Sequence, residues 1–193
     1  MSEPITADLI LYGYTRGVFP MADPDTGEIA WYSPDPRGII PIDTWKPKRS
    51  LRNLMNRGWY EFRINTDFDA VIRHCANRDE TWISNDIIHL YTELHHRGFA
   101  HSVEVWRDGE LRGGLYGVAI NGAFFGESMF SLESNTSKLA LHFLVQTMKH
   151  RGLVLLDTQW ITSHLDFLGG VYISRQEYMR RLSRAMQLAV SFL

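Results

Sequence analysis

The strongest constraint on the fold is a change of hydrophobic period in the middle of the chain. Val103 and Val105 alternate with polar residues, and the turn pairs Asp108-Gly109 and Asn121-Gly122 enclose a second run of strand-forming residues. A third such run covers residues 123–130. The pattern predicts two consecutive hairpins and hence an antiparallel meander.

The segment after the meander returns to the period of a helix. Apolar residues at helical spacing predict a helix over residues 136–151, which Gly152 would close. The apolar run Val154 to Leu156 then predicts a buried strand that ends at Asp157. Hairpins followed by a helix and a strand are similar to the acetyltransferase fold, so we predict an α+β chain with an acetyltransferase-like (GNAT-type) α/β domain.

The rest of the chain predicts shorter elements. All but one of the seven prolines fall between residues 19 and 47, where we expect loops and short strands, including one at 38–42. Helices are predicted at 6–16, 50–58, 66–75, 84–97, 162–168 and from Ser174, and strands at 59–64 and 171–173. The residues predicted to cap helices at the N-terminus are Thr6, Ser50, Thr66 and Ser174. A shift of composition near Tyr60 predicts a small N-terminal domain at residues 1–60 and the acetyltransferase-like domain at residues 61–193.

Composition excludes several classes of protein. Lys and Arg number 20 against 22 Asp and Glu, and this net charge of −2 argues against a protein that coats nucleic acid by bulk electrostatics. Cys75 is the single cysteine and cannot form an internal disulfide. With no leader or bilayer-spanning apolar stretch in evidence, we expect a cytoplasmic protein.

Familiar catalytic motifs are missing from the sequence. No stretch supplies a P-loop, and Gly126-Glu127-Ser128 lacks the second glycine of a nucleophile elbow, which disfavours nucleotide and serine hydrolysis. The eight histidines show no metal-ligand spacing, so we expect no metal and regard those at 95, 96 and 101 as surface or turn residues. The glycine-rich pyrophosphate loop of acetyl-CoA-dependent enzymes is also missing, so we expect no bound cofactor.

Two clusters combine aromatic or apolar residues with a charge. The loop from Trp31 to Arg37 holds two aromatic residues, two prolines and an arginine that we expect to be exposed. Alternatively, Trp31 and Tyr32 fill the interface between the N-terminal portion and the main domain, and Arg37 pairs with Asp35. Glu127 is the one carboxylate in an almost wholly apolar strand, where it needs a partner or a task because an unpaired buried charge is costly.

A third cluster, Asp157-Thr158-Gln159, directly follows an apolar strand. Strand ends commonly place polar side chains at a crevice. The cluster therefore predicts a carboxylate and an amide at the mouth of an apolar pocket. A simpler interpretation makes Asp157 a helix cap and Gln159 a solvent-exposed residue.

A basic stretch without acidic residues lies between residues 46 and 57, with aromatic residues on both sides. This combination is typical of surfaces that contact a nucleic-acid backbone, although a solvated charged face is the simpler alternative. Its basic residues are Lys46, Lys48, Arg49, Arg52 and Arg57.

Together and in this order, the clusters resemble the leucyl/phenylalanyl-tRNA-protein transferases of bacteria. The resemblance covers nearly the whole chain. The matching motifs are Gly17-Val18-Phe19-Pro20, Trp31 to Arg37, Phe124 to Ser131, Asn135 to Lys138, and Asp157-Thr158-Gln159 through His164-Leu165 to Leu168-Gly169.

The resemblance implies a leucyltransferase-type enzyme that moves Leu, Phe or Met from aminoacyl-tRNA to the N-terminal Arg or Lys of a protein. The product would be marked for degradation. Because an aminoacyl ester is already activated, positioning should dominate catalysis without a metal or a covalent intermediate. The alternatives are an acetyl-CoA-dependent N-acyltransferase and a non-catalytic RNA-binding module.

The resemblance also implies roles for individual residues. Asp157 and Gln159 match the catalytic pair, and Glu127 matches a carboxylate of the substrate pocket. Residues expected to line the donor side-chain pocket are Phe124, Met129 and Leu156, and those expected near the terminal adenosine are Trp31 and Trp82. Residues expected to contact the tRNA are Arg37, Lys46, Lys48, Arg49 and Arg52.

Overall fold

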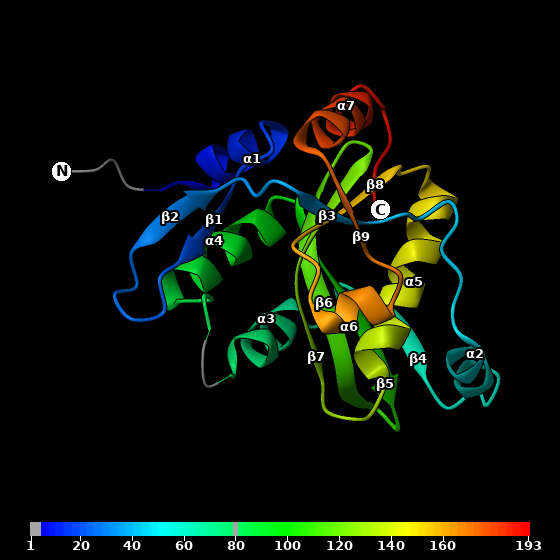
Figure 1. Cartoon of the computed structure of the whole chain (residues 1–193). Helices are drawn as coiled ribbons and strands as arrows, with labels where there is room; N and C mark the ends of the chain where they lie inside the picture. Colours follow the sequence, from blue (N-terminus) through cyan, green and yellow to red (C-terminus); the bar gives the residue numbers. More distant parts are fainter. Residues whose placement is uncertain (1–4, 79–80) are drawn as a thin grey trace.

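A central sheet with helices on both faces dominates the computed structural model, which describes residues 5–78 and 81–193 (Figure 1). The strand order of this sheet is β4-β5-β6-β7-β8-β3-β9. A separate two-stranded sheet pairs β1 (Phe19–Ala22) with β2 (Ile29–Tyr32). The structure thus confirms a mixed α/β chain built around a central sheet.

The predicted meander forms the middle of the central sheet. β5 (Ala100–Arg107), β6 (Glu110–Ile120) and β7 (Ala123–Ser131) pair antiparallel in sequence order, and β4 (Glu61–Ile64) extends the sheet beyond β5. Asp108 and Asn121 adopt left-handed backbone conformations at the two turns, with φ of 54° and 50°. These turn residues tolerate that conformation, which explains why the sequence marks both turns clearly.

α5 (Thr136–Arg151) carries the chain from β7 to β8 (Leu155–Gln159), and β8 pairs parallel to β7. The helix has the predicted bounds. β3 (Arg37–Ile40) pairs antiparallel with β8 on one side and with β9 (Val171–Ile173) on the other. Although β3 comes from the first 60 residues, it lies inside the main sheet; the domain division at residue 60 stays a prediction.

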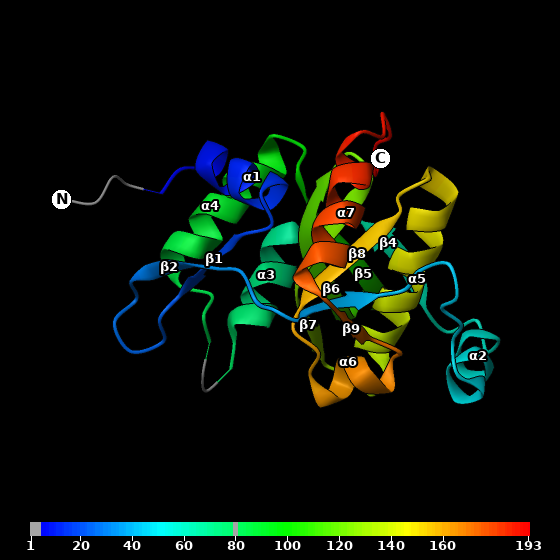
Figure 2. The ribbon, with the colours of Figure 1, turned by 45° about the horizontal axis from the view of Figure 1, so that its top comes forward.

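The two faces of the sheet are covered by different helices (Figure 2). One hydrophobic core includes side chains of α1 (Ala7–Thr15), α3 (Phe68–Ala76), α4 (Asn85–His96) and α7 (Arg175–Met186). The other includes α5 and α2 (Arg49–Met55). In the described part of the chain, none of the helices has the length and apolar character that a bilayer crossing demands.

Two predicted helix caps are wrong by one position or more. α2 begins at Arg49, directly after Lys48, so Ser50 lies inside the helix. α3 is capped by Asp67, one residue after the predicted Thr66, and the Asp67 side chain accepts from Ala70 N at 3.0 Å. The predicted caps Thr6 and Ser174 are confirmed, and Ser84 and Thr162, where two further helices were predicted to begin, also cap them.

Candidate active site

A cavity opens at the end of the parallel pair β7 and β8. The two strands pair from Ala123 opposite Leu155 to Phe125 opposite Asp157. Just beyond, residues of both strands line a cavity of about 570 Å³, which we call the central cavity. Its wall is completed by residues from α5, from β1 and from the start of α6 (Ser163–Phe167).

Glu127 reaches this cavity because β7 is bulged. Tyr116 lies opposite Ser128 and Gly117 lies opposite Gly126, so Glu127 has no partner residue in the register of β6 and β7. A bulge of this kind turns a side chain away from the regular alternation of the strand. A Cβ at Gly117 would lie 2.2 Å from the Phe125 carbonyl oxygen, so the bulge also requires a glycine there.

The Glu127 carboxylate is held by hydroxyl and amide donors. Tyr14 donates to Oε1 at 2.6 Å and Gln159 Nε2 donates to the same oxygen at 2.9 Å. The Tyr91 hydroxyl lies 3.4 Å from Oε2 and shares its single proton between this oxygen and the Tyr14 hydroxyl. Removal from bulk water raises the pKa of Glu127 to about 7, with a contribution from the negative charge of Asp157. The sequence prediction that this carboxylate has partners is confirmed.

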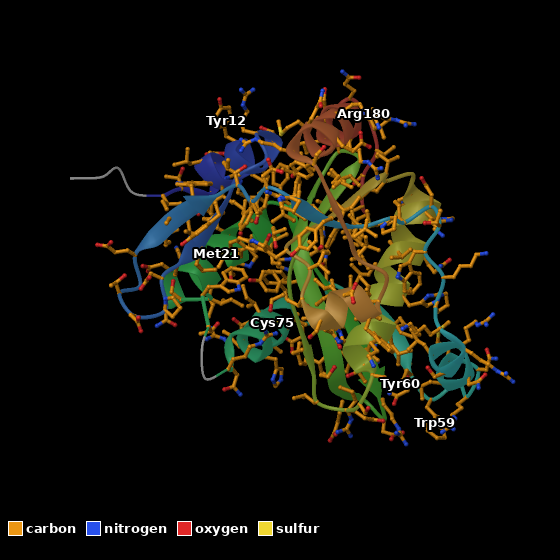
Figure 3. All side chains as sticks on the ribbon, in the orientation of Figure 1. Tyr12, Met21, Trp59, Tyr60, Cys75 and Arg180 are labelled. Atoms are coloured by element: carbon orange, nitrogen blue, oxygen red, sulfur yellow. The ribbon has the colours of Figure 1, made fainter. Side chains whose placement is uncertain are left out.

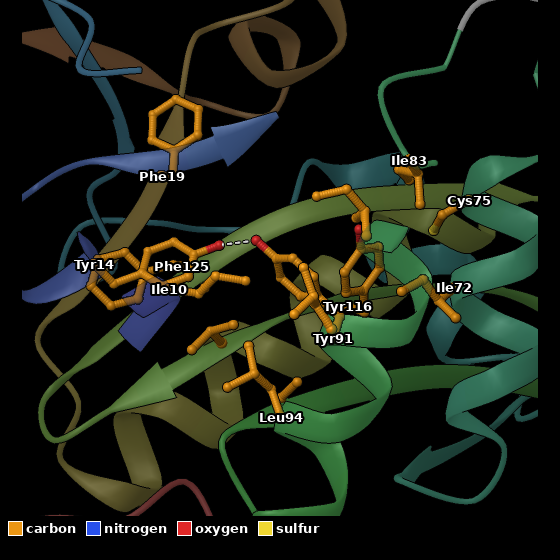
Figure 4. Packing of buried hydrophobic residues seen from close by; sticks show 14 of the residues in the cluster. Ile10, Tyr14, Phe19, Ile72, Cys75, Ile83, Tyr91, Leu94, Tyr116 and Phe125 are labelled. Atoms are coloured by element: carbon orange, nitrogen blue, oxygen red, sulfur yellow. Dashed lines mark hydrogen bonds between the residues drawn. The ribbon is translucent and has the colours of Figure 1, made fainter. Parts of the chain in front are cut away.

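The two tyrosines form a buried pair beneath Glu127. Figure 4 shows the hydrogen bond between the hydroxyls of Tyr14 and Tyr91, with Phe125 against the Tyr14 ring at a centroid distance of 4.7 Å. Burial first, and then the charge of Glu127, raises the pKa of both hydroxyls well above the usual value. Both tyrosines therefore remain hydrogen-bond donors.

Asp157 lies behind the wall of the central cavity and is fully buried. Its Oδ1 accepts from Arg37 Nε at 3.0 Å and from the backbone N–H of Gln159 at 2.9 Å. Its Oδ2 accepts from Arg37 Nη2 and from the Tyr178 hydroxyl, both at 2.7 Å. These four hydrogen bonds leave the carboxylate without a free acceptor position. Asp157 therefore holds Arg37, Tyr178 and the backbone of Gln159 in place.

Gln159 lines the central cavity, and Asp157 holds its backbone in place. Its backbone has a φ of 60°, a conformation that costs a residue with a side chain on the order of 1 kcal/mol. The bond from its N–H to Asp157 and the bond from Nε2 to Glu127 hold it from both ends. Because Nε2 faces a carboxylate, Oε1 is the end that can accept a hydrogen bond from a ligand.

Apolar side chains dominate the rest of the central cavity. The predicted residues Met129, Leu156 and Trp82 line it, together with Met21 and Leu115. Phe124, which was expected to line the cavity, does not line it. Its side chain is fully buried and packs against Phe192 at a ring-centroid distance of 5.1 Å.

Trp31 also lies elsewhere than expected. It belongs to β2 and covers Gly13 of α1, where a Cβ would lie 2.5 Å from its ring. Its side chain is 37% exposed. Trp31 therefore packs the N-terminal helix against the two-stranded sheet, and this contact lies within the first 60 residues and not between the two portions of the chain.

Three polar atoms of the lining have no hydrogen-bond partner among the described residues. They are the buried Tyr116 Oη, Thr158 Oγ1 and His164 Nε2. Buried polar groups are normally paired, so these three unpartnered atoms are exceptions in an otherwise apolar lining.

A second cavity, of about 720 Å³, lies on the far side of α6. Thr162, His164 and Leu165 line the central cavity, whereas Asp166 and Phe167 line this second one. We call it the basic groove. Its positively charged lining residues are Lys46, Lys48, Arg57 and Lys138.

The charges of the basic groove lie at the surface. Lys48 Nζ lies 3.2 Å from the centroid of the Phe167 ring, and Lys138 Nζ lies 5.0 Å from it. The predicted Arg49 and Arg52 lie on the exposed side of α2 beside the groove. Within residues 5–78 and 81–193, none of these basic residues forms an ion pair with a carboxylate. Figure 3 separates this region, marked by Trp59, from Met21 at the central cavity.

The expectation that Arg37 is exposed is wrong. Only 1% of its side chain is exposed, and its guanidinium lies between the rings of Phe19 and Tyr178 at 4.9 and 4.4 Å. Its Nη1 donates to the Gly17 carbonyl at 3.0 Å. Arg37 pairs with Asp157, not with Asp35 as the alternative interpretation supposed.

Several residues that build the site were not predicted from the sequence. Tyr14 and Tyr91 occupy apolar positions of helices, so their hydroxyls gave no signal. Tyr178 lies in the last helix, 21 residues from Asp157. Arg57 belonged to the noted basic stretch, and Lys138 to the noted motif at 135–138, so the sequence did contain a signal for these two.

Known proteins match this chain over nearly its whole length. The family model described as leucyl/phenylalanyl-tRNA protein transferase matches residues 39–183, and the model of its N-terminal domain matches residues 3–35. Proteins named leucyl/phenylalanyl-tRNA–protein transferase are similar to the chain throughout. The one from Ruegeria sp. (strain TM1040) is 50% identical over 190 residues, 98% of this chain and 90% of that protein.

Two further relatives bear the same name. The Prosthecochloris aestuarii protein is 48% identical and covers 95% of this chain and 97% of its own length. The Herpetosiphon aurantiacus protein is 47% identical over 100% of both chains.

Among solved structures, L-PGS from Bacillus licheniformis is similar at a TM-score of 0.45 and 13% identity, covering 91% of this chain and 62% of that one. This likeness is too low to assign the fold.

Proposed function

Because this chain belongs to the leucyl/phenylalanyl-tRNA protein transferase family, we propose that it transfers Leu, Phe or Met from aminoacyl-tRNA to the N-terminal Arg or Lys of a protein. The observation that carries this proposal is the pair of cavities on either side of α6. The central cavity has an apolar wall beside the Glu127 carboxylate and the Gln159 amide, and the second cavity is the basic groove. An aminoacyl-tRNA has matching parts: an apolar side chain on a reactive ester, and a polyanionic body.

The donor side chain would occupy the apolar part of the central cavity. Met129, Leu156 and Leu115 form a wall there that excludes water from a Leu, Phe or Met side chain. Trp82 lies on the same cavity and can stack on the terminal adenosine. The exposed Lys46, Lys48, Arg49 and Arg52 would contact the tRNA phosphates, and we leave the buried Arg37 out of this surface.

Gln159 would position the attacking amine. Its Oε1 accepts a hydrogen bond from the α-amine, while the bond from Nε2 to Glu127 keeps the amide from rotating. The amine nitrogen forms a bond to the ester carbonyl carbon, the bond from that carbon to the ribose oxygen breaks, and the ribose oxygen takes up a proton. An α-amine with a pKa near 8 is partly neutral at physiological pH, so it needs little activation.

Glu127 would receive the proton that the amine loses. A pKa of about 7 suits a group that must accept and release a proton near neutral pH. Asp157 is saturated and acts as a positioning residue for Gln159 through the bond to its N–H. Arg37 and Tyr178 in turn hold Asp157.

The proposal also covers the domain division, the cellular location and the fate of the product. We propose that β5, β6, β7, α5 and β8 constitute an acetyltransferase-like catalytic domain within residues 61–193, behind a small N-terminal domain at 1–60. The enzyme would work in the cytoplasm, where aminoacyl-tRNA is available. Its products would be marked for degradation.

The direct test is transfer of labelled Phe or Leu from charged tRNA to peptides that begin with Arg, Lys or Gly. We expect labelled product with the Arg and Lys peptides and none with the Gly peptide. Absence of transfer to all three by a folded protein would overturn the proposal. Equal binding of charged and uncharged tRNA without transfer would instead indicate an RNA-binding module.

A further inference from the structure

A third cavity lies next to the central cavity and shares one wall with it. This cavity of about 560 Å³, which we call the aromatic pocket, is lined by Tyr32, Ser33, Pro34, Asp35, Pro36, Trp160 and Tyr172. Trp160 lines both cavities and directly follows Gln159 in the chain. The aromatic pocket is therefore one side chain away from the proposed position of the attacking amine.

The sheet brings these residues together. β3 lies between β8 and β9, and its Gly38 is opposite both Gln159 and Tyr172. The end of β8 and the start of β3 consequently meet at one edge, which places Trp160 near the loop that carries Asp35. A Cβ at Gly38 would lie 2.8 Å from the Trp160 carbonyl carbon, so a glycine allows this close approach.

The pocket has the chemistry of a site for an organic cation. Tyr32, Trp160 and Tyr172 are 37%, 38% and 49% exposed, which leaves ring surface available. The Tyr172 hydroxyl accepts from the backbone N–H of Ile161 at 3.0 Å and is thereby fixed. Aromatic faces attract guanidinium and ammonium groups, and they also pack against the alkyl stem that carries such a group.

Asp35 adds a negative charge to these rings. Its Oδ1 accepts from the backbone N–H of Arg175 at 3.2 Å, which orients the carboxylate at the beginning of α7. Asp35 is exposed, and among the described residues no cationic side chain forms an ion pair with it. One carboxylate oxygen remains for a cation.

The carboxylates nearer the reacting atoms are already engaged. Asp157 accepts four hydrogen bonds and has no exposed surface, while Glu127 is held by Tyr14 and Gln159. The central cavity also contains Arg78 in its lining, which would repel a second cation. A basic side chain of the acceptor therefore finds its free negative partner in the aromatic pocket.

We infer that the aromatic pocket binds the guanidinium or ammonium side chain of the acceptor's N-terminal residue, with Asp35 as the charge that selects it. This inference rests on the proposed transfer reaction. The α-amine would lie at Gln159, and the side chain would pass over Trp160 to Tyr32, Tyr172 and Asp35. The pocket would thus determine acceptor specificity, separately from the donor pocket.

The test compares two peptides that differ at the N-terminal residue, one with Arg and one with the neutral isostere citrulline. The kcat/KM ratio of the two peptides measures how strongly the enzyme uses the charge. For Asp35→Asn, which keeps an acceptor oxygen for Arg175, we expect the KM of the Arg peptide to rise on the order of tenfold. The citrulline peptide and the KM for Phe-tRNA should change little, so the ratio should fall towards one.

The matched control is Asp43→Asn, which removes the same charge from an exposed residue that does not line the aromatic pocket. It should leave the ratio at the wild-type value. Tyr172→Phe keeps the ring and should preserve the KM of the Arg peptide, whereas Tyr172→Leu should raise it.

The outcomes separate this inference from the proposed function. A wild-type enzyme that transfers to neither Arg nor Lys peptides would refute the proposed function. An active wild type with an unchanged Arg-to-citrulline ratio in Asp35→Asn would refute the aromatic pocket alone. A fall in kcat for both peptides with unchanged KM would also refute it, because that pattern indicates a structural effect.

Discussion

The central cavity and the basic groove lie on opposite sides of α6 and differ in whether their charged side chains are paired. In and behind the central cavity, the charged and polar groups of Asp157, Arg37 and Glu127 are bonded to one another or to tyrosines and an amide. In the basic groove, the lysines and arginines lie at the surface and form no ion pair with a described carboxylate.

Under the proposed function, this difference would divide the work between the two cavities. Internally bonded groups are preorganised, so they can hold one small reacting centre in a fixed geometry. Surface charges without ionic partners remain available to a large polyanion, with an affinity that depends on salt. The first cavity should therefore be sensitive to a single atom, and the second should respond to the number of charges.

The largest effect is expected for Asp157→Ala. This change leaves the Arg37 guanidinium buried without its partner, which costs about 3–5 kcal/mol of unfolding free energy. Gln159 also loses the acceptor for its N–H, so transfer should fall below detection. Urea unfolding and peptide transfer measure the two effects.

A double variant keeps this prediction testable if Asp157→Ala does not fold. Combining Arg37→Leu with Asp157→Leu removes both charges and should recover most of the stability, because a buried pair can be replaced by apolar residues. Transfer should remain lost. Full activity in either variant would contradict the role of Asp157 in positioning Gln159.

Glu127→Gln should have the next largest effect, on turnover. The introduced amide retains an oxygen that can accept from Tyr14 and Gln159, but it cannot take up the proton of the amine. Wild-type kcat should rise with pH through about 7, and the variant should lose this rise together with a factor of about 100 or more at pH 8. A variant with the wild-type pH profile would show that another group accepts the proton.

The same variant gives a stability prediction with a definite sign. The pKa of Glu127 is raised from 4.5 to about 7 in the folded state, so the folded protein binds the proton more tightly than the unfolded chain. The stability of the wild type relative to Glu127→Gln is therefore greatest below pH 4.5 and declines as pH rises from there through about 7. The total change is on the order of 3 kcal/mol, and urea unfolding across this range measures it.

Smaller, additive effects are expected in the basic groove. Replacing Lys48 and Arg52 with Ala should weaken tRNA binding on the order of tenfold at low salt, while the loss of the Lys48–Phe167 contact lowers the unfolding free energy by no more than about 1 kcal/mol. The slope of log affinity against log salt should become shallower by about 0.7–0.9 for each charge removed. Lys149→Ala, at the exposed last turn of α5, is the matched control and should leave the slope unchanged.

Regular local patterns allowed much of the fold to be predicted. The meander turns and the bounds of α5 follow from turn pairs and helical spacing within short segments. The place of Gln159 at the mouth of an apolar cavity follows from the apolar strand before it. Such features depend on neighbours in sequence.

The contacts that complete the site depend on residues distant in sequence. Arg37 and Asp157 are 120 residues apart, and Tyr14 and Glu127 are 113 apart. No local pattern shows that an arginine in a proline-rich loop becomes buried at the end of β8. The position of Phe124 likewise depends on Phe192, which packs against it from the end of the chain.

The most direct test of the divided roles compares two donors, Phe-tRNA and phenylalanyl-adenosine, which keeps the ester and adenosine but lacks the tRNA body. With Lys46, Lys48, Arg49 and Arg52 all changed to Ala, kcat/KM should fall by a large factor for Phe-tRNA and stay at the wild-type value for phenylalanyl-adenosine. Glu127→Gln should lower both equally. An equal loss for both donors in the four-residue variant would contradict the account, because the groove would then act on the reacting end of the donor.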